Sequence, residues 1–213
     1  MKKFIMLLLI VFFVPAIVHA ADPLLEPPHW SLEFKGGSFA PALADWALYY
    51  DKRSMPILEG SLAYKLIRQV DIGISLGYAQ DKGHALAPGH SSAAGNVTYE
   101  IFPVNLFILL RGVVDEDQWL VPYAGGGFTR LYYKEKIESQ GTVNGSVDGY
   151  HVRGGLQFLL NSLDEKAANR MFQDYGIHHT YLFGEAEYTH AVVKSVSVNL
   201  GGTAYMFGFL FEF

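Results

Sequence analysis

The chain has 213 residues, with 16 basic and 21 acidic side chains, a formal net charge of −5, and no cysteine. The lack of cysteine excludes disulfide bridges, thiolate metal sites and cysteine nucleophiles, and the acidic balance argues against a nucleic-acid partner, because phosphate backbones favour basic surfaces. Charged residues make up only 17% of the chain, below the roughly 25% of soluble domains, while aromatic residues reach 15% and glycines number 22.

The first twenty residues have the pattern of an export signal. Lys2 and Lys3 precede an apolar run over residues 4–18, and small residues precede a cleavage point after Ala20. The run is shorter than the roughly 20 apolar residues of a membrane-spanning helix. We therefore predict a signal peptide over residues 1–20 and a mature domain over residues 21–213. An exported chain without disulfides is typical of a bacterial envelope.

Alternation of apolar with small or polar residues predicts eight β-strands. The clearest case is residues 70–80, where Ile72, Ile74, Leu76 and Tyr78 share one parity and smaller residues take the other. The same alternation marks seven further segments, at residues 30–35, 58–66, 97–111, 119–133, 150–158, 181–190 and 205–213. An even number of strands fits a closed, antiparallel, up-and-down transmembrane β-barrel. The predicted fold class is therefore all-β.

Two of these strands are less regular. In residues 97–111 the apolar parity switches at Pro103, which predicts a β-bulge there, because proline cannot donate to a strand ladder. In residues 119–133 we expect Arg130 to face the lumen, opposite four lipid-facing apolar side chains: Val121, Tyr123, Leu131 and Tyr133.

The connections and the aromatic residues suggest an orientation. Residues 40–54, 80–95 and 134–148 are predicted to be long outer loops, and residues 68–70 and 112–117 short periplasmic turns. Aromatic residues then fall at two heights, which predicts two interfacial girdles. The outer girdle would contain Tyr78, Tyr99, Tyr133, Tyr150 and Tyr188, and the periplasmic girdle Trp30, Tyr64, Trp119, Phe158 and Phe213. A soluble β-sandwich, the alternative fold, gives no reason for this sorting.

A helix is predicted between the sixth and seventh strands. Ser162 and Glu165 fit a capping box, Gly176 fits a helix stop, and apolar residues between them recur at three- and four-residue steps. We expect a short amphipathic helix over residues 162–175 that packs under the barrel floor or lies on the inner leaflet. The alternative is a docking surface for a periplasmic partner.

Together these features resemble the small outer-membrane barrels related to OmpA, OmpX and OmpW. The residues Gly208, Phe211 and Phe213 match the C-terminal barrel-assembly signal of such proteins, although Met206 stands where that signal usually has a polar residue. The helix is more like that of uncharacterised delta-proteobacterial barrels. The resemblance implies a monomer in the outer membrane of a Gram-negative bacterium. Its implied partners are outer-membrane lipid, lipopolysaccharide and, during biogenesis, the barrel-assembly machinery.

Charged residues gather on the inward parity of the predicted strands. An eight-stranded barrel is just wide enough for side chains to fill it, and an unpaired charge in its interior would be costly. We therefore expect a connected network that plugs the lumen. The alternative is a narrow pore lined by the same residues. They are Glu33, Lys35, Glu59, Lys65, Arg111, Arg130, His151, Arg153, Glu185 and Glu187.

Enzymatic and metal sites find little support. Some outer-membrane barrels that this chain resembles hydrolyse acyl chains of lipid A with a lipid-facing His and Ser and a Glu. Here Val192 replaces the serine expected two residues after His190, and Glu187 has the opposite parity to His190. The paired His178 and His179 point apart if extended. We expect no enzyme activity, no cofactor and no metal.

The outer loop at residues 40–54 carries Trp46, Tyr49 and Tyr50. Exposed aromatics are costly unless they touch something, so they either pack over the barrel mouth or bind an apolar ligand. The sequence thus predicts a non-enzymatic barrel with a structural or surface-binding role through its outer loops. The alternative is a narrow OmpW-like channel or binding site for small hydrophobic molecules, and a lipid-modifying acyl hydrolase is a remote third.

Overall fold

The computed structural model describes residues 27–43, 46, 50, 53–86, 93–115, 118–138, 141–193 and 197–213. The predicted signal peptide at residues 1–20 lies outside this part of the chain, so the division at Ala20 stays a prediction.

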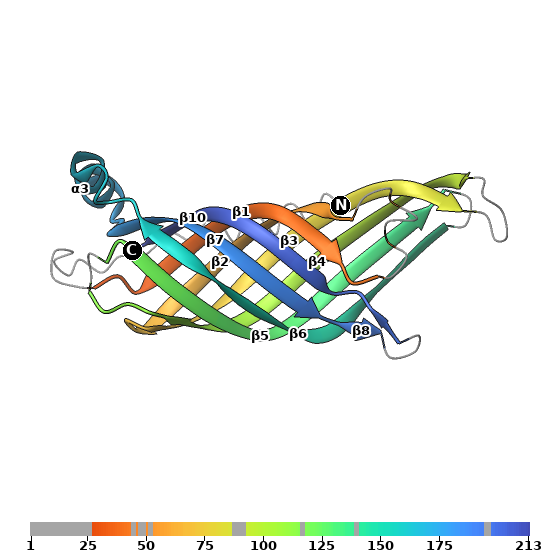
Figure 1. Cartoon of the computed structure of the whole chain (residues 1–213), viewed down its shortest axis with the longest axis horizontal. Helices are drawn as coiled ribbons and strands as arrows, with labels where there is room; N and C mark the ends of the chain where they lie inside the picture. Colours follow the sequence, from red (N-terminus) through yellow and green to blue (C-terminus); the bar gives the residue numbers. More distant parts are fainter. Residues whose placement is uncertain are drawn as a thin grey trace.

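Eight antiparallel strands form a closed barrel, as predicted (Figure 1). Each strand pairs with its sequence neighbour in the barrel, and the first strand pairs with the last, in the order β1-β10-β7-β6-β5-β4-β3-β2. In the sequence, a small hairpin lies between the last two barrel strands. Its strands, β8 (Val192–Val193) and β9 (Val198–Asn199), have two residues each. The barrel strands are β1 (Trp30–Pro41), β2 (Met55–Ile67), β3 (Val70–Leu86), β4 (Ala93–Arg111), β5 (Leu120–Ile137), β6 (Gly141–Leu159), β7 (His179–His190) and β10 (Gly202–Glu212).

The outer surface of the barrel is apolar and the lumen is mixed. On β3, Ile72, Ile74 and Leu76 are exposed on the outside, while Asp71 and Ser75 are buried inside. The predicted facing is confirmed for β1, β2, β3, β6, β7 and β10. Since lipid would cover the outside, this pattern is the one that a transmembrane barrel requires.

The predicted facing is wrong for β5 and for the outer half of β4. Val121, Tyr123 and Leu131 are buried in the lumen, and Arg130 points outward. On β4 the odd-numbered residues face inward from Val97 to Arg111, and the register with β5 is unbroken at Pro103, so no bulge forms there. The physical reason is that the lumen holds two apolar clusters. Leu131 and the outer half of β4 belong to the cluster at the outer mouth, and Val121 and Tyr123 to a second cluster toward the opposite end, so an apolar side chain at either place does not indicate lipid.

The outer girdle is therefore smaller than predicted. Tyr78, Tyr150 and Tyr188 are exposed on the outside, but Tyr99 is buried and Tyr133 packs with it in the cluster at the mouth. At the barrel end near α3, which we call the periplasmic rim after the predicted orientation, the exposed outside residues are Trp30, Tyr64, Trp119, Phe158 and Phe213. The exposed apolar side chains between these two rims form a belt around the barrel, which we call the apolar belt.

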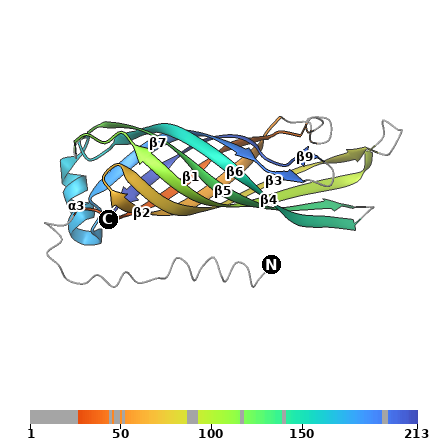
Figure 2. The same ribbon diagram turned by 90° about the horizontal axis from the view of Figure 1, so that it is seen from below.

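Two of the predicted outer loops are strands over most of their length. β3 and β4 stay paired from the barrel wall out to Leu86 and Ala93, and β5 and β6 stay paired out to Ile137 and Gly141. Figure 2 shows these two hairpins extending past the other strands. The sequence pattern does not predict these extensions, because polar and small residues occupy most positions on both faces and leave no regular apolar period.

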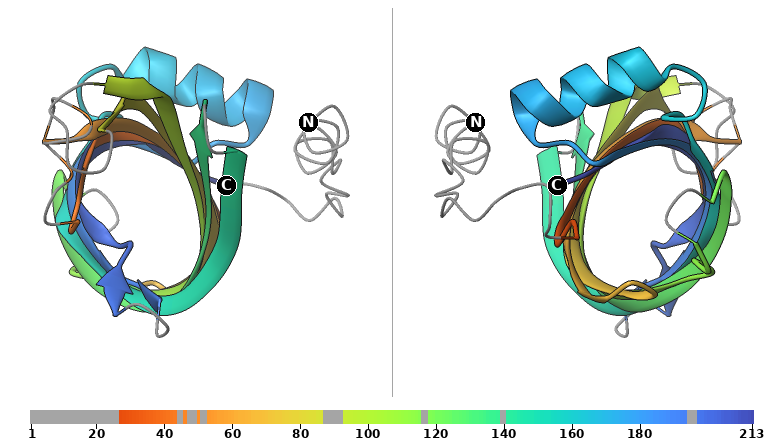
Figure 3. Two further views of the ribbon diagram at one scale, coloured as in Figure 1. Left: turned by 90° about the vertical axis from the view of Figure 1, so that its right-hand side faces the viewer. Right: turned by 90° about the vertical axis from the view of Figure 1, so that its left-hand side faces the viewer.

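The predicted helix is present as α3 (Glu165–Tyr175), with one of its two caps different. Asp164, not Ser162, is the N-cap: its side chain accepts from the backbone N–H groups of Lys166 and Ala167. Gly176 is the C-cap, in the left-handed region at φ 69°. Figure 3 shows α3 beside the end of the barrel wall rather than across its opening. Within the described ranges, no helix is long and apolar enough to cross a membrane.

Candidate functional site

The centre of the lumen holds a buried lysine between two carboxylates. Lys35 of β1 places its Nζ 2.7 Å from Glu59 Oε1 of β2 and 2.7 Å from Glu185 Oε1 of β7. All three side chains are fully shielded from solvent. Gly208 of β10 makes room for this arrangement, because a Cβ there would lie 2.8 Å from Lys35 Cβ and closer still to the Phe34 carbonyl oxygen.

A second cation completes this network. Arg153 of β6 places Nη1 3.2 Å from Glu33 Oε2 and 3.5 Å from Glu185 Oε2. Its guanidinium also lies over the Phe107 ring, 4.0 Å from the centroid. The Tyr123 hydroxyl donates to Glu185 Oε2 at 2.9 Å. Glu185 is therefore held by three partners from three strands, which satisfies a carboxylate far from water.

A separate group of polar hydrogen bonds lies in the lumen beside this network. Asn105 donates to Ser75 Oγ at 3.0 Å and accepts from Thr129 Oγ1 at 2.8 Å. Thr129 Oγ1 in turn lies 2.9 Å from His151 Nδ1. Glu187 faces the same region, where Thr189 donates to it at 3.3 Å. All of these side chains are buried inside the lumen.

A separate charged cluster closes the periplasmic end. Arg111 contacts Glu212 directly and donates from Nε and Nη2 to Gln157 Oε1, at 3.1 and 2.8 Å. Lys65 Nζ lies 2.5 Å from Glu212 Oε1, and His179 Nδ1 lies 2.9 Å from Glu212 Oε2. Glu212 is thus the centre of this cluster. We did not predict its role, although its parity, opposite to Phe211 and Phe213, indicates the lumen.

The structure brings together every residue of the predicted lumen network except Arg130. Placing Arg130 in the lumen is wrong, because 49% of its side chain is exposed on the outside of the barrel. There it lies 3.6 Å from Asp148 and over the Tyr132 ring. The remaining members fall into the two clusters described above, with Lys65 and Arg111 in the periplasmic one.

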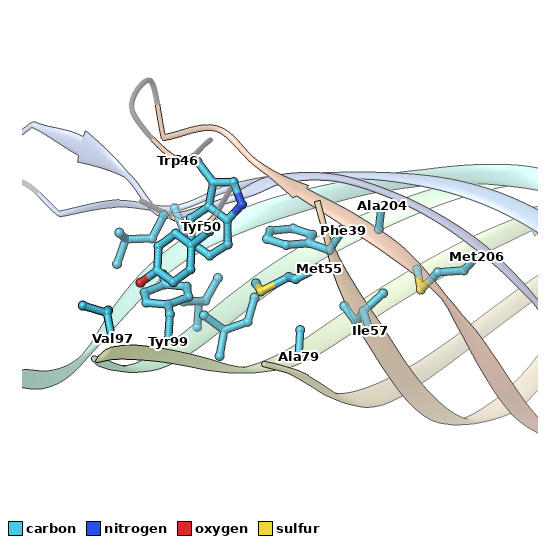
Figure 4. Close-up of a cluster of buried hydrophobic side chains, with 14 residues drawn as sticks. Phe39, Trp46, Tyr50, Met55, Ile57, Ala79, Val97, Tyr99, Ala204 and Met206 are labelled. Carbon is cyan, nitrogen blue, oxygen red and sulfur yellow. The ribbon is translucent and has the colours of Figure 1, made fainter. Parts of the chain in front are cut away.

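The outer mouth is filled by aromatic side chains from the β1–β2 connection. Trp46 and Tyr50 stack with ring centroids 3.9 Å apart, and both meet the edge of Tyr99. Figure 4 shows them beside Tyr99, in line with Met55 and Met206 inside the barrel. Burial, followed by the nearby Glu135, raises the pKa of the Tyr50 hydroxyl, which therefore stays neutral. Tyr49 lies outside the described residues.

The described histidines His178, His179 and His190 are not arranged as a catalytic or metal site. His190 faces outward beside Tyr150 and Tyr188, whereas Glu187 faces the lumen, so the two cannot share a proton. His178 packs on Phe172 of α3, and burial, followed by the neighbouring His179, lowers its pKa. In the part of the chain that the structure describes, no group of three or more His, Asp or Glu side chains is placed to hold a metal ion.

No family model matches the sequence, and no curated protein does either. Solved structures do share the fold. Neisserial surface protein A (NspA) aligns with a TM-score of 0.56 at 10% identity, over 86% of this chain and 97% of its own. Ail, the attachment invasion locus protein of Yersinia pestis, in complex with the heparin analogue sucrose octasulfate, aligns with a TM-score of 0.54 at 12% identity. This alignment covers 88% of this chain and 100% of Ail.

The outer membrane protein OprG from Pseudomonas aeruginosa also gives a TM-score of 0.54, at 14% identity, over 87% of this chain and 97% of its own. These likenesses show that the fold is that of the small bacterial outer-membrane barrels, as the sequence pattern predicted. The exposed apolar belt between the two rims fits the same location.

Proposed function

We propose that this chain is a non-enzymatic outer-membrane barrel with a closed lumen that acts at the cell surface through the extended strands β3 to β6. The observation that carries this proposal is that buried side chains fill the lumen at three successive levels. These are the Glu212 cluster, the Lys35–Glu185 network and the Trp46–Tyr50 stack.

The contacts at these levels oppose opening of the lumen. The two charged levels join strands from across the barrel, so opening either one would strand carboxylates or cations away from water, which is costly. By contrast, the extensions of β3 to β6 pass beyond the outer aromatic rim and present paired, rigid backbone. Rigid extensions with polar faces suit contact with molecules outside the membrane.

The second candidate is passage or binding of a small hydrophobic molecule. One observation favours it: Trp46 and Tyr50 belong to the β1–β2 connection and not to the barrel wall, so the outer plug can leave without breaking the barrel ladder. A ligand would replace the Trp46–Tyr50 stack against Tyr99. Passage would then also require the Lys35–Glu185 network to part.

Two measurements on the refolded protein test the proposal. In planar bilayers we expect no conductance above the protein-free level, and in liposomes no faster uptake of an apolar dye. Sustained single-channel steps, or rapid dye uptake that Trp46→Ala accelerates, would favour the second candidate. On intact cells, a Thr142→Cys variant should react with a membrane-impermeant thiol reagent, because the proposed orientation puts the end of the β5–β6 hairpin outside the cell. Protection of this cysteine would contradict that orientation.

A further inference from the structure

Basic side chains gather on the outward face of the extended β3–β5 sheet. Lys82 of β3, Lys134 and Lys136 of β5, and Arg130 lower on β5 all have the outward parity of their strands. We call these four residues the basic patch. Three of them, with Gln80, Thr98 and Glu100, line a hollow of about 290 Å³ on this face. Arg130 lies below it, over the Tyr132 ring.

The basic patch continues the lipid-facing surface of the barrel. Lys134 is two residues beyond Tyr132, and Lys82 is four beyond Tyr78, on the same face as these exposed rim aromatics. Among the described residues, the outward positions between the two rims carry no charge apart from Arg130, which lies at the level of the outer rim and is paired with Asp148. The basic patch therefore faces laterally, toward the molecules that surround the barrel, and not along the barrel axis into solvent.

The patch holds more positive than negative charge. Glu100 lies 3.6 Å from Lys134 and accepts from Gln80 at 3.1 Å, and Asp148 lies 3.6 Å from Arg130. Lys82 and Lys136 have no acidic partner in the described ranges. These two lysines therefore remain without a contacting carboxylate, with Glu138, two residues beyond Lys136 and just past the end of β5, as a further acidic residue of the same parity, on a chain whose overall charge is −5. An anionic ligand supplied by the surroundings would match them.

The height of the patch separates two classes of lipid. The headgroup layer of a phospholipid leaflet is about 5–8 Å thick. Four residues of a strand tilted by about 40° climb about 10 Å above the rim, which places Lys82 and Lys136 beyond that layer. A lipid whose anionic groups continue outward on a sugar headgroup reaches them, whereas a glycerophospholipid does not.

We propose that the basic patch binds the phosphate groups of lipopolysaccharide, packed against the outer rim beside β3, β4 and β5. The proposal rests on the proposed function, because it needs these extensions to lie on the outer side. Lys82, Lys134 and Lys136 contact the phosphates, while Tyr78, Phe102 and Tyr132 pack against the acyl and sugar parts beneath them. The ligand is held at one side of the barrel only.

The test compares the refolded full chain with a Lys82→Ala/Lys134→Ala/Lys136→Ala variant in nanodiscs. The matched control is Lys166→Ala/Arg170→Ala, which removes basic residues from α3 at the other end. Binding is measured for phosphorylated lipopolysaccharide, for its dephosphorylated form, for phosphatidylglycerol and for inorganic phosphate. An interfacial lysine raises affinity for an anionic surface about fivefold, so the triple variant should lose between about tenfold and about 100-fold in affinity for the phosphorylated form.

We expect the unaltered chain and the control to prefer the phosphorylated form, and the triple variant to lose that preference. Equal affinity of all three proteins, an equal response to the dephosphorylated form, or an equal preference for phosphatidylglycerol or inorganic phosphate would overturn the proposal. Heat-modifiable migration on a gel checks that each variant is folded. Conductance is recorded on the same samples to separate the two proposals. A barrel that conducts but still binds phosphorylated lipopolysaccharide contradicts the closed lumen and not this site. A barrel that does not conduct and shows no preference for the phosphorylated form contradicts this site and not the closed lumen.

Discussion

Lys35 and Glu185 meet across the lumen, with Nζ 2.7 Å from Oε1, although they belong to strands that are not neighbours. β1 and β7 are separated by β10, the strand that closes the barrel against β1. The ion pair therefore spans the closing seam from the inside. Because Lys35 also contacts Glu59 on β2, one ammonium group links three strands on both sides of that seam.

Replacing Lys35 should destabilise the folded barrel strongly. Lys35→Met keeps most of the side-chain volume but leaves Glu59 and Glu185 without their shared cation. Breaking a buried ion pair by removing one partner costs about 3–5 kcal/mol. Urea unfolding in phospholipid vesicles, followed by tryptophan fluorescence, measures this change in the free energy of unfolding.

The double variant Lys35→Met/Glu185→Gln supplies the control. It removes one of the stranded charges, so it should be more stable than Lys35→Met alone. If Lys35→Met loses less than about 1 kcal/mol, as an exposed pair would, the lumen is hydrated and the plug assignment is wrong.

The aromatic stack at the outer mouth should control access to the lumen. Met55 is 1% exposed beneath it, and the chain has no native cysteine, so a Met55→Cys variant carries a single reporter. An aromatic pair contributes about 0.5–1.5 kcal/mol beyond its buried area. Adding Trp46→Ala should then raise the rate of labelling by a polar thiol reagent at least about threefold.

Tyr150→Ala is the matched control, since Tyr150 is an exposed aromatic on the outside of the same rim. It should leave the labelling rate of Met55→Cys unchanged. Equal acceleration by both substitutions would mean that general loosening, not removal of the plug, exposes the reporter.

Depth in the membrane should decide the cost of a charge on β3. Ile74 faces outward between Leu62 and Leu106, in the middle of the apolar belt. Ile74→Arg should cost about 2–4 kcal/mol, while Gln80→Arg, on the same face beyond the outer rim, should cost about 0–1 kcal/mol. Vesicle unfolding of both variants measures the difference. Equal costs would show that the belt is misplaced along the strand.

The sequence predicted the barrel and most of the lumen because one parity of each regular strand is apolar and the other is not. Glu33, Glu59 and Arg153 were placed inside on that basis, and they lie there. The pairing of these charged side chains into ion pairs was not predictable from the sequence. Lys35 and Glu185 are 150 residues apart and meet only through the register accumulated around the closed barrel.

The same rule failed where the lumen changes character with depth. At mid-membrane the interior is polar, so an apolar side chain indicates lipid. At the outer mouth Tyr99 and Leu131 are buried inside and Arg130 faces outward, so an apolar side chain there indicates the lumen. Near the start of β5, Val121 and Tyr123 are buried in a second apolar cluster, and the rule fails there for the same reason. Glu212 escapes the sequence prediction for another reason, because the aromatic residues on either side of it match an assembly signal.

The assembly signal itself stays a prediction, and the structure sharpens its test. The Phe213 backbone closes the barrel seam: its N–H donates to the Trp30 carbonyl at 2.9 Å, and its carbonyl accepts from His29 and Trp30 at 3.1 and 2.8 Å. Deleting Phe213 would remove these hydrogen bonds, so an effect on folding could not be separated from an effect on recognition by the assembly machinery. Phe213→Ala keeps them and removes only the ring.

Phe213→Ala should therefore impair insertion in cells much more than it impairs refolding. The ring is 37% exposed at the periplasmic rim, so its loss removes at most about 1.5–3 kcal/mol of burial, and purified protein should still refold into liposomes. Phe207→Ala, on the same face of β10 but outside the signal, is the control. Outer-membrane levels in cells should fall for Phe213→Ala and stay near normal for Phe207→Ala. Normal levels of both variants would contradict the signal, because a residue read by the assembly machinery has no neighbour that can replace its terminal ring.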